Sequence, residues 1–269
     1  MSHAKKVVCV ILAFVCVLSV GATVFLLLNV TPCWRCGQLI HFGECSGMLN
    51  NDNATPLDAS KTNQKYSLLE KTAKADETYL DNIYFIGDSR TVGLSTYTAI
   101  SKDHLLGEVG MNLSQAINKK VVPINAKKIA SIPDAVGIYV PDMMIINFGI
   151  NGIGWTPVEE MIKEYEALLD ALKKKSPESI VIVQSVLPVS SFYQKNNPKV
   201  TNKKIDTLNL AILEMAKKRE IYFMNTAEVM LNKNNNLKDE YTSDGLHFNK
   251  DGNEKIMDYV LSHTVIPKN

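Results

Sequence analysis

The sequence has no excess of charge of either sign, since 29 Lys and Arg residues stand against 28 Asp and Glu. It also lacks a patch of Lys or Arg residues interleaved with aromatic ones, which a nucleic-acid surface usually needs. These two absences exclude nucleic acid as an expected partner. The remaining composition, with 46% hydrophobic and 21% charged residues in 269, fits one medium-sized globular domain plus additional segments.

Charge is absent altogether from Val7 to Asn29. At ~1.5 Å per helical residue, this apolar run is long enough to cross a hydrocarbon core of ~30 Å. Lys5 and Lys6 precede it, whereas only Arg35 lies close behind it. By the positive-inside rule, we expect residues 1–6 to be cytoplasmic, residues 7–30 to be a single-pass transmembrane signal anchor, and the rest of the chain to be extracytoplasmic.

A cleaved signal peptide is the alternative, because Val20–Ala22 resembles a small-residue cleavage site. The protein would then be secreted. The apolar run continues beyond that site through Phe25–Leu28, which favours the uncleaved anchor.

The segment 31–78 follows the predicted anchor and contains Cys33, Cys36, His41 and Cys45. Three thiolates and one imidazole could bind zinc tetrahedrally, although their spacing is one residue short of a zinc-knuckle pattern. Outside a membrane, the same cysteines could instead pair as a disulfide, with one left over, or stay free, and we favour this interpretation over zinc. The polar stretch over 46–78 predicts a tether.

Strand-like and helix-like segments alternate through residues 79–269, the predicted globular domain. The expected strands are Ile83–Ile86, Leu105–Val109, Met143–Phe148, Ile180–Val186 and Ile221–Met224. The expected helices are Thr91–Ile100, Leu113–Val122, Pro157–Lys175, Lys203–Arg219 and Lys250–Ser262. The continuous apolar character of Met143–Phe148 is typical of a parallel strand that is covered on both faces. The alternation predicts the α/β class, with a three-layer α/β/α, flavodoxin-like, doubly wound parallel sheet.

The first expected strand ends abruptly in a small polar turn, Gly87-Asp88-Ser89-Arg90. A serine at this place lies at the carboxyl end of a parallel strand, where open α/β sheets bind their ligands. Taken alone, Ser89 is more typical of a helix N-cap than of a nucleophile. Asp88 is expected to anchor the turn by hydrogen bonds.

Two further short motifs contain the partners that a nucleophilic serine requires. Asp244 and His247 are spaced so that the carboxylate can accept from one imidazole nitrogen while the other nitrogen faces Ser89. Asn151 follows another expected strand and could donate its amide hydrogens to a developing oxyanion. Each motif alone is commonly a turn or a capping pair. Their order and their places at strand ends or in the final loop favour a hydrolase-type site.

Together, Gly87-Asp88-Ser89, Gly149-Ile150-Asn151 and Asp244-x-x-His247 resemble the SGNH, or GDSL-type, hydrolase superfamily. The resemblance implies that Ser89 is the nucleophile, that His247 is the general base and acid, and that Asp244 orients His247.

The same resemblance implies an oxyanion hole that consists of the Ser89 and Gly110 backbone N–H groups and the Asn151 amide. Gly107 competes with Gly110 for this role. A serine-based site of this kind needs no cofactor, and the sequence contains no evidence for one.

Two residues near these motifs bear on the substrate. Arg90 stands where leucine is usual in the name-giving motif, and it could form a salt bridge or contact an anionic or polar substrate group. Trp155 could stack on a sugar or an acyl group, or it could serve packing.

The resemblance implies a serine hydrolase that acts on ester bonds through an acyl-enzyme. Because we expect the domain to lie outside a membrane, an acyl-ester substrate such as an O-acetylated cell-envelope glycan is favoured over a long-chain lipid. An O-acyltransferase with the same site, and a membrane-tethered accessory protein with an idle site, remain open.

Overall fold

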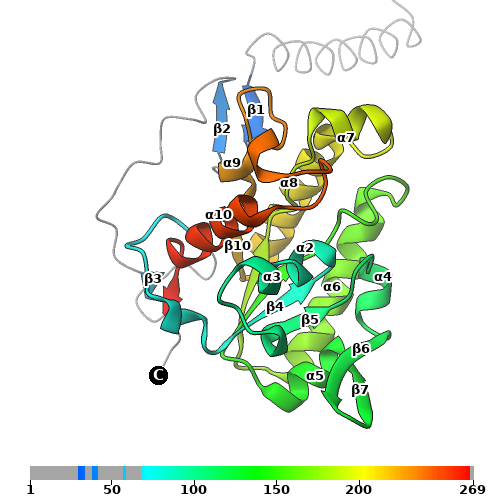
Figure 1. Cartoon of the computed structure of the whole chain (residues 1–269), viewed down its shortest axis with the longest axis vertical. Coiled ribbons are helices and arrows are strands. Elements are labelled where there is room, and N and C mark those ends of the chain that lie inside the picture. Colours follow the sequence, from blue (N-terminus) through cyan, green and yellow to red (C-terminus); the bar gives the residue numbers. More distant parts are fainter. Residues whose placement is uncertain (1–29, 34–37, 42–56, 59–67, 267–269) are drawn as a thin grey trace, which may run out of the picture. The chain divides into compact units, whose positions relative to one another are not determined.

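The computed structural model describes residues 30–33, 38–41, 57–58 and 68–266, in two compact units, Met1–Asn50 and Asn51–Asn269 (Figure 1). In the first unit, β1 (Val30–Cys33) pairs with β2 (Gln38–His41) in an antiparallel hairpin. Apart from Val30, the predicted anchor 7–30 lies outside the described residues. Within the described part, no helix has the length and apolar character needed to span a membrane.

The cysteine segment is described only in part, because Cys33 lies in β1 and His41 in β2 while Cys36 and Cys45 fall outside the described residues. Among the residues that the structure does describe, no group of three or more His, Cys, Asp or Glu side chains could hold a metal ion. The zinc alternative therefore stays a prediction.

A parallel sheet of five strands lies at the centre of the described part of the second unit. Its strands are β4 (Ile83–Gly87), β5 (Leu105–Gly107), β8 (Met143–Asn147), β9 (Ile180–Gln184) and β10 (Tyr222–Met224). They lie in the order β10-β9-β8-β4-β5, and every pairing is parallel. The predicted parallel α/β sheet is confirmed, and numbered along the chain its strand order is that of flavodoxin-like folds.

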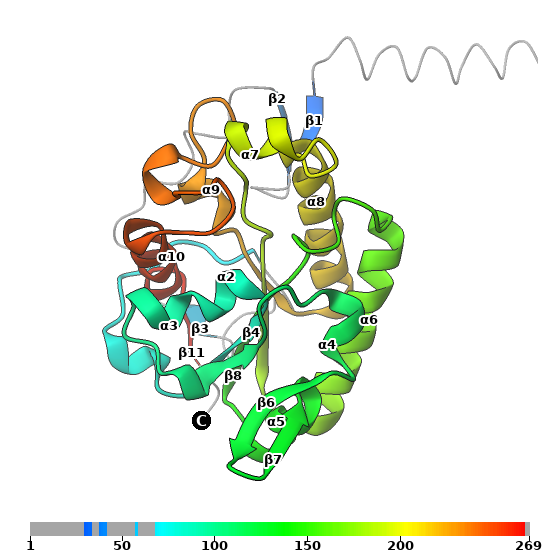
Figure 2. The ribbon, with the colours of Figure 1, turned by 45° about the vertical axis from the view of Figure 1, so that its right-hand side comes forward.

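Helices cover both faces of this sheet, as Figure 2 shows. One side carries α4 (Leu113–Ala116), α5 (Ile132–Tyr139), α6 (Val158–Lys175) and α8 (Asn202–Arg219). The other side carries α2 (Ser89–Val92), α3 (Leu94–Tyr97) and α10 (Lys250–Leu261). All five residues of β8 are buried, as its unbroken apolar sequence predicts for a strand with helices on both faces.

Helix α6 shows how the amphipathic pattern fixes the packing. Its buried residues are the predicted apolar face, namely Met161, Tyr165, Leu168, Leu169 and Leu172. The Tyr165 hydroxyl accepts from the Phe148 N–H and donates to the Phe148 carbonyl, each at 2.8 Å. Because Phe148 directly follows β8, this helix also fixes the start of the loop that carries Asn151.

The helix predicted over Leu113–Val122 is wrong beyond its first turn. Helix α4 ends at Ala116, and the chain then forms a hairpin of β6 (Lys120–Asn125) and β7 (Lys128–Ser131). Pro123 disfavours helical backbone at the residue before it, and the adjacent valines prefer extended backbone.

The remaining elements are short. They are β3 (Leu57–Asp58), which pairs with β11 (Val265–Ile266), the 3₁₀ helices η2 (Glu77–Leu80), η3 (Lys102–His104) and η4 (Asp239–Tyr241), and the helices α7 (Ser191–Asn196) and α9 (Ala227–Met230). Helix α7 is not among the helices expected from the sequence.

The last part of the predicted tether belongs to the folded domain. Leu69 is buried, and its N–H donates to the Phe223 carbonyl of β10 at 2.9 Å. The Thr72 N–H donates to the Ser262 carbonyl at 2.7 Å. Residues 68–78 therefore pack against the sheet and α10, and the domain begins before residue 79, because isolated apolar residues such as Leu69 suffice to dock an extended segment.

His263, two residues after the end of α10, predicts acid sensitivity of the fold. Its buried ring stacks on Tyr259 at 3.6 Å between centroids, and Nδ1 lies 2.8 Å from the Tyr259 carbonyl. Burial lowers the pKa of His263 to about 4, although the Tyr259 hydrogen bond opposes the shift. An unfolded histidine has a pKa of roughly 6.5. Since the folded state binds the proton less readily, stability is complete above pH ~6.5 and falls by about 3 kcal/mol as the pH drops to ~4.

Chemical denaturation at a series of pH values, followed by circular dichroism, measures this loss. The same series on His263→Gln should show a flatter slope between pH ~6.5 and ~4, because the titrating group is gone. Equal slopes for the two proteins would contradict the assignment.

Candidate active site

The carboxyl edge of the sheet contains a topological switch point. From β4 the chain moves to β5 on one side and then returns to β8 on the other. Gly87, the last residue of β4, lies opposite Asn147, the last residue of β8. Open α/β sheets bind ligands in the crevice at such a point. Ser89 follows the first of these strand ends, and Asn151 follows the second.

Gly107 and Gly110 lie near this edge, and each position needs glycine for a different structural reason. Gly107 ends β5 in register with Gly87, and a Cβ on Gly107 would lie 1.8 Å from the Gly87 carbonyl oxygen. Gly107 is therefore required by the close approach of two strands. Gly110 lies in the following turn with a φ of +77° and no atom within 4 Å of a Cβ position, so its backbone conformation favours glycine in an open place.

Asp88, not Ser89, caps the helix that follows β4. The Asp88 Oδ1 atom accepts from the Arg90 N–H at 3.0 Å, and Ser89 is the first residue of α2. The prediction that Asp88 anchors the turn by hydrogen bonds is thus confirmed. Because Asp88 satisfies the helix end, the Ser89 hydroxyl is left to face another partner.

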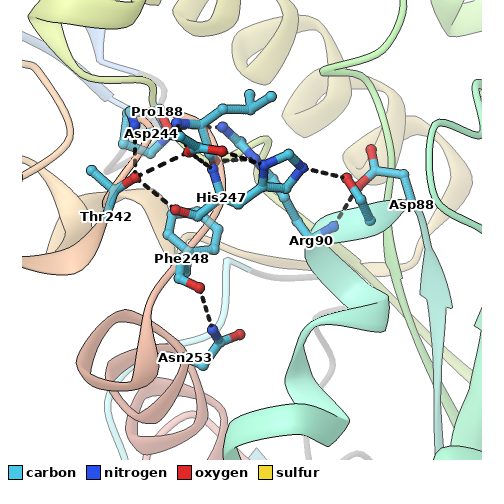
Figure 3. Close-up of polar contacts among 11 residues, drawn as sticks. Asp88, Arg90, Pro188, Thr242, Asp244, His247, Phe248 and Asn253 are labelled. Atoms are coloured by element: carbon cyan, nitrogen blue, oxygen red, sulfur yellow. Dashed lines mark hydrogen bonds and ion pairs between the residues drawn. The ribbon is translucent and has the colours of Figure 1, made fainter.

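That partner is His247, 158 positions away in the sequence (Figure 3). The Ser89 Oγ atom lies 3.1 Å from His247 Nε2, and His247 Nδ1 lies 2.7 Å from Asp244 Oδ2. A carboxylate only accepts hydrogen bonds, so Nδ1 carries the proton and Nε2 is the acceptor for the serine O–H. The three side chains are therefore hydrogen-bonded in series, from the Ser89 hydroxyl through the His247 ring to the Asp244 carboxylate.

Asp244 is held as a carboxylate by the loop around it. Partial burial raises its pKa, but hydrogen bonds from the His247 side chain and from the backbone N–H groups of Leu246 and His247 outweigh burial and bring the pKa to about 2. Asp244 is thus ionised throughout the neutral range. Asp244 Oδ1 accepts from the His247 N–H and so positions the backbone, while Oδ2 bonds to Nδ1 and positions the ring.

Thr242 is a loop residue that the sequence did not indicate. Its hydroxyl donates to the His247 carbonyl at 2.6 Å and accepts from the Gly245 N–H at 2.9 Å. It closes the turn that carries Asp244 and His247. A threonine two residues before the aspartate is too common in turns to have been a signal by itself.

A hydrogen bond holds the Asn151 side chain next to the turn that contains Gly110. The Asn151 side-chain amide donates to the Met111 carbonyl at 3.0 Å, next to Gly110. This bond uses one of the two amide hydrogens and fixes the orientation of the amide group.

The two predicted substrate contacts differ sharply in exposure. Trp155 is 70% exposed, in the turn that follows Asn151. Arg90 is only 4% exposed, and its guanidinium donates to the Leu246, Leu187 and Pro188 carbonyls. A substrate contact by Arg90 does not fit this burial, because its side chain points into the protein between two loops.

Comparison with known proteins agrees with this geometry. The model of the GDSL-like Lipase/Acylhydrolase family matches residues 85–255, which contain Ser89, Asn151, Asp244 and His247. The match covers more than half of the chain, and the chain belongs to this family. It is accordingly an ester-hydrolysing enzyme.

Solved structures share the fold at low sequence identity. A GDSL-like lipase from Bacteroides thetaiotaomicron is 21% identical, with a TM-score of 0.51, over 69% of this chain and 87% of that one. A proposed platelet activating factor from Streptococcus pneumonia is 23% identical, with a TM-score of 0.52, over 66% of this chain and 81% of that one. No curated protein matches the chain in sequence.

Proposed function

We propose that the chain is a serine esterase in which Ser89 attacks an acyl ester, His247 moves the proton and Asp244 orients His247. The observation that carries this proposal is the pair of contacts from Ser89 Oγ to His247 Nε2 at 3.1 Å and from His247 Nδ1 to Asp244 Oδ2 at 2.7 Å. With Nδ1 protonated, Nε2 of His247 can accept the Ser89 proton, and the Asp244 carboxylate accepts the hydrogen bond from Nδ1 that orients the ring.

In the first half-reaction, Ser89 Oγ bonds to the ester carbonyl carbon while its proton passes to Nε2 of His247. The tetrahedral intermediate then collapses, the ester C–O bond breaks, and His247 returns the proton to the leaving oxygen. In the second half-reaction, water attacks the acyl-Ser89 ester with His247 again as base, and the carboxylic acid and free Ser89 result.

The negative charge of the intermediate needs hydrogen-bond donors at the same edge of the sheet. We assign this oxyanion hole to the N–H groups of Ser89 and Gly110 and to the Asn151 amide. The amide retains a second hydrogen besides the one that it donates to Met111, and this bond holds it beside the Gly110 turn. A preorganised donor of this kind is worth roughly 10²–10³-fold in kcat.

For the substrate, we propose a small acyl group, O-acetyl, on a cell-envelope carbohydrate. Asp244 and His247 are about half exposed, so the reacting groups lie near the surface, within reach of an ester on a large polymer. The exposed Trp155 can stack on a sugar ring. The predicted membrane anchor over 7–30 would place the enzyme beside such a polymer, with the domain outside the cell membrane.

Product analysis with the full-length chain tests this substrate class. An O-acetylated envelope glycan and a long-chain phospholipid are offered separately, and the released acetate or fatty acid is measured. We expect acetate from the glycan. When an unacetylated oligosaccharide is added as acceptor, its acetylation in place of free acetate would identify an O-acyltransferase with the same site. Fatty-acid release without any deacetylation of the glycan would refute the proposed substrate.

A further inference from the structure

Arg90 is a buried cation next to the nucleophile, at the position where the name-giving motif of the family has leucine. It lies on the first turn of α2, directly after Ser89, and is 4% exposed. A buried guanidinium is costly unless its N–H groups find acceptors. The acceptors of Arg90 therefore indicate what this position does here.

Those acceptors are backbone carbonyls from two separate loops. Arg90 Nε donates to Leu246 at 3.1 Å, Nη1 to Leu187 at 2.6 Å and Nη2 to Pro188 at 3.1 Å. Leu246 belongs to the loop of Asp244 and His247, whereas Leu187 and Pro188 follow β9. One planar side chain thus joins the histidine loop to the edge of the sheet, beside the helix that carries Ser89 (Figure 3).

The bond to Leu246 has a particular consequence, because the Leu246 carbonyl and the His247 N–H belong to one peptide group. Arg90 holds the oxygen of that group, and Asp244 Oδ1 accepts from its N–H at 2.7 Å. The peptide plane is rigid, so bonds at both ends fix the backbone from which the His247 side chain extends. Phe248, on the other side of His247, has its ring 5.1 Å from the guanidinium carbon.

The electrostatic surroundings allow Arg90 to remain charged. Burial lowers its pKa to about 10, and the nearby carboxylates of Asp88 and Asp244 oppose the shift. Asp88 is itself fully buried, and burial raises its pKa, while the charge of Arg90 opposes that shift. Arg90 is therefore protonated at neutral pH and can donate all its bonds.

We propose that Arg90 is a positioning residue that fixes the Leu246–His247 peptide against the loop after β9 and so keeps His247 Nε2 within hydrogen-bond reach of Ser89 Oγ. As a mechanistic claim, the proposal rests on the proposed function of Ser89 and His247. It assigns to position 90 a task that a leucine cannot perform, since an aliphatic side chain fills the space but has no donors for the three carbonyls.

Two substitutions test the proposal by kinetics with p-nitrophenyl acetate. Arg90→Leu removes the charge and the donors, whereas Arg90→Lys keeps a cation near Asp88 but loses the planar set of N–H groups. In both we expect kcat to fall by about 10- to 100-fold, as for a small misplacement of a catalytic group, while KM changes by less than about twofold. If Arg90→Leu fails to fold, the kcat and KM of Arg90→Lys alone test the proposal.

The matched control is Ser179→Ala. Ser179 is a buried residue directly before β9, at the edge of the sheet opposite the active site, and its hydroxyl donates to the Pro141 carbonyl. Its loss destabilises the fold but leaves the carbonyls that Arg90 contacts, and the Leu246–His247 peptide, in place. We expect a lower melting temperature with kcat within about twofold of the original. If Ser179→Ala loses as much kcat as the Arg90 variants, general destabilisation explains their effect and the proposal is wrong.

A second readout does not depend on activity. Nitrogen-15 NMR of the histidine rings in the full-length chain, at mildly alkaline pH, reports which nitrogen of His247 carries the proton, and His247→Gln identifies the signals. We expect the Nδ1–H tautomer in the original chain and an averaged tautomer in the Arg90 variants.

The outcomes separate the two proposals. If the original chain hydrolyses no ester but the tautomer still changes in Arg90→Lys, the proposed function fails while the positioning role stands. A folded Arg90→Lys with unchanged kcat and an unchanged tautomer would overturn the positioning role alone.

Discussion

Replacement of Ser89 by alanine is expected to lower kcat for p-nitrophenyl acetate by about 10⁵- to 10⁶-fold, the scale seen when the nucleophile of a serine hydrolase is removed. The hydroxyl contacts His247 Nε2 at 3.1 Å, and no acyl-enzyme can form without it. The fold should persist, since Asp88 and not Ser89 caps α2. Initial rates and circular dichroism of the full-length variant measure both effects.

The control for this change is Ser95→Ala. Ser95 lies in α3, and its hydroxyl donates to the Val92 carbonyl at 3.2 Å. It should keep full activity, and a fluorophosphonate should label Ser95→Ala but not Ser89→Ala. Equal hydrolysis by the original chain and by Ser89→Ala would show that Ser89 is not the nucleophile.

Replacement of Asp244 by asparagine is expected to lower kcat by about 10⁴-fold. Asp244 accepts from the ring of His247 and from two backbone N–H groups of its own loop. With asparagine, the amide oxygen can keep the backbone bonds only if the NH₂ group faces Nδ1. That arrangement stabilises the Nε2–H tautomer, which cannot accept the serine proton.

The pH profile of the original chain provides a further check on the role of Asp244. Hydrogen bonds from His247 and from two N–H groups hold the pKa of Asp244 at about 2, against the effect of burial, so in the original chain protonation of Asp244 should not limit kcat above pH ~3. Asp239→Asn, an exposed change in the adjacent η4, is the control and should leave kcat unaltered. If Asp244→Asn keeps more than a tenth of kcat, another group orients the histidine.

The residues expected to act on the ester could be named from short motifs, because each belongs to a local pattern. Ser89 follows an apolar strand, and Asp244 and His247 lie in one turn. The strand order follows less directly. Each of the strands could be recognised, but only their pairing shows that β4 lies between β5 and β8 and that Ser89 and Asn151 emerge at the switch point.

Predictions from the local sequence pattern were wrong in two segments. The apolar spacing of Leu113–Val122 suits a helix, yet Pro123 and the two valines before it favour the β6–β7 hairpin. The segment 68–78 reads as polar linker, but Leu69 is buried and bonded to β10. In both places a few residues outweigh the average composition.

By itself, the sequence determined the fold class, the family resemblance and the serine, histidine and aspartate to be tested, since strand periodicity and motif chemistry are local properties. Only the tertiary structure decided how Arg90 is used. A charged residue beside a nucleophile looks the same in sequence whether it faces a substrate or the interior. Burial and the three carbonyls from distant loops show that it faces inward, toward the loop of His247.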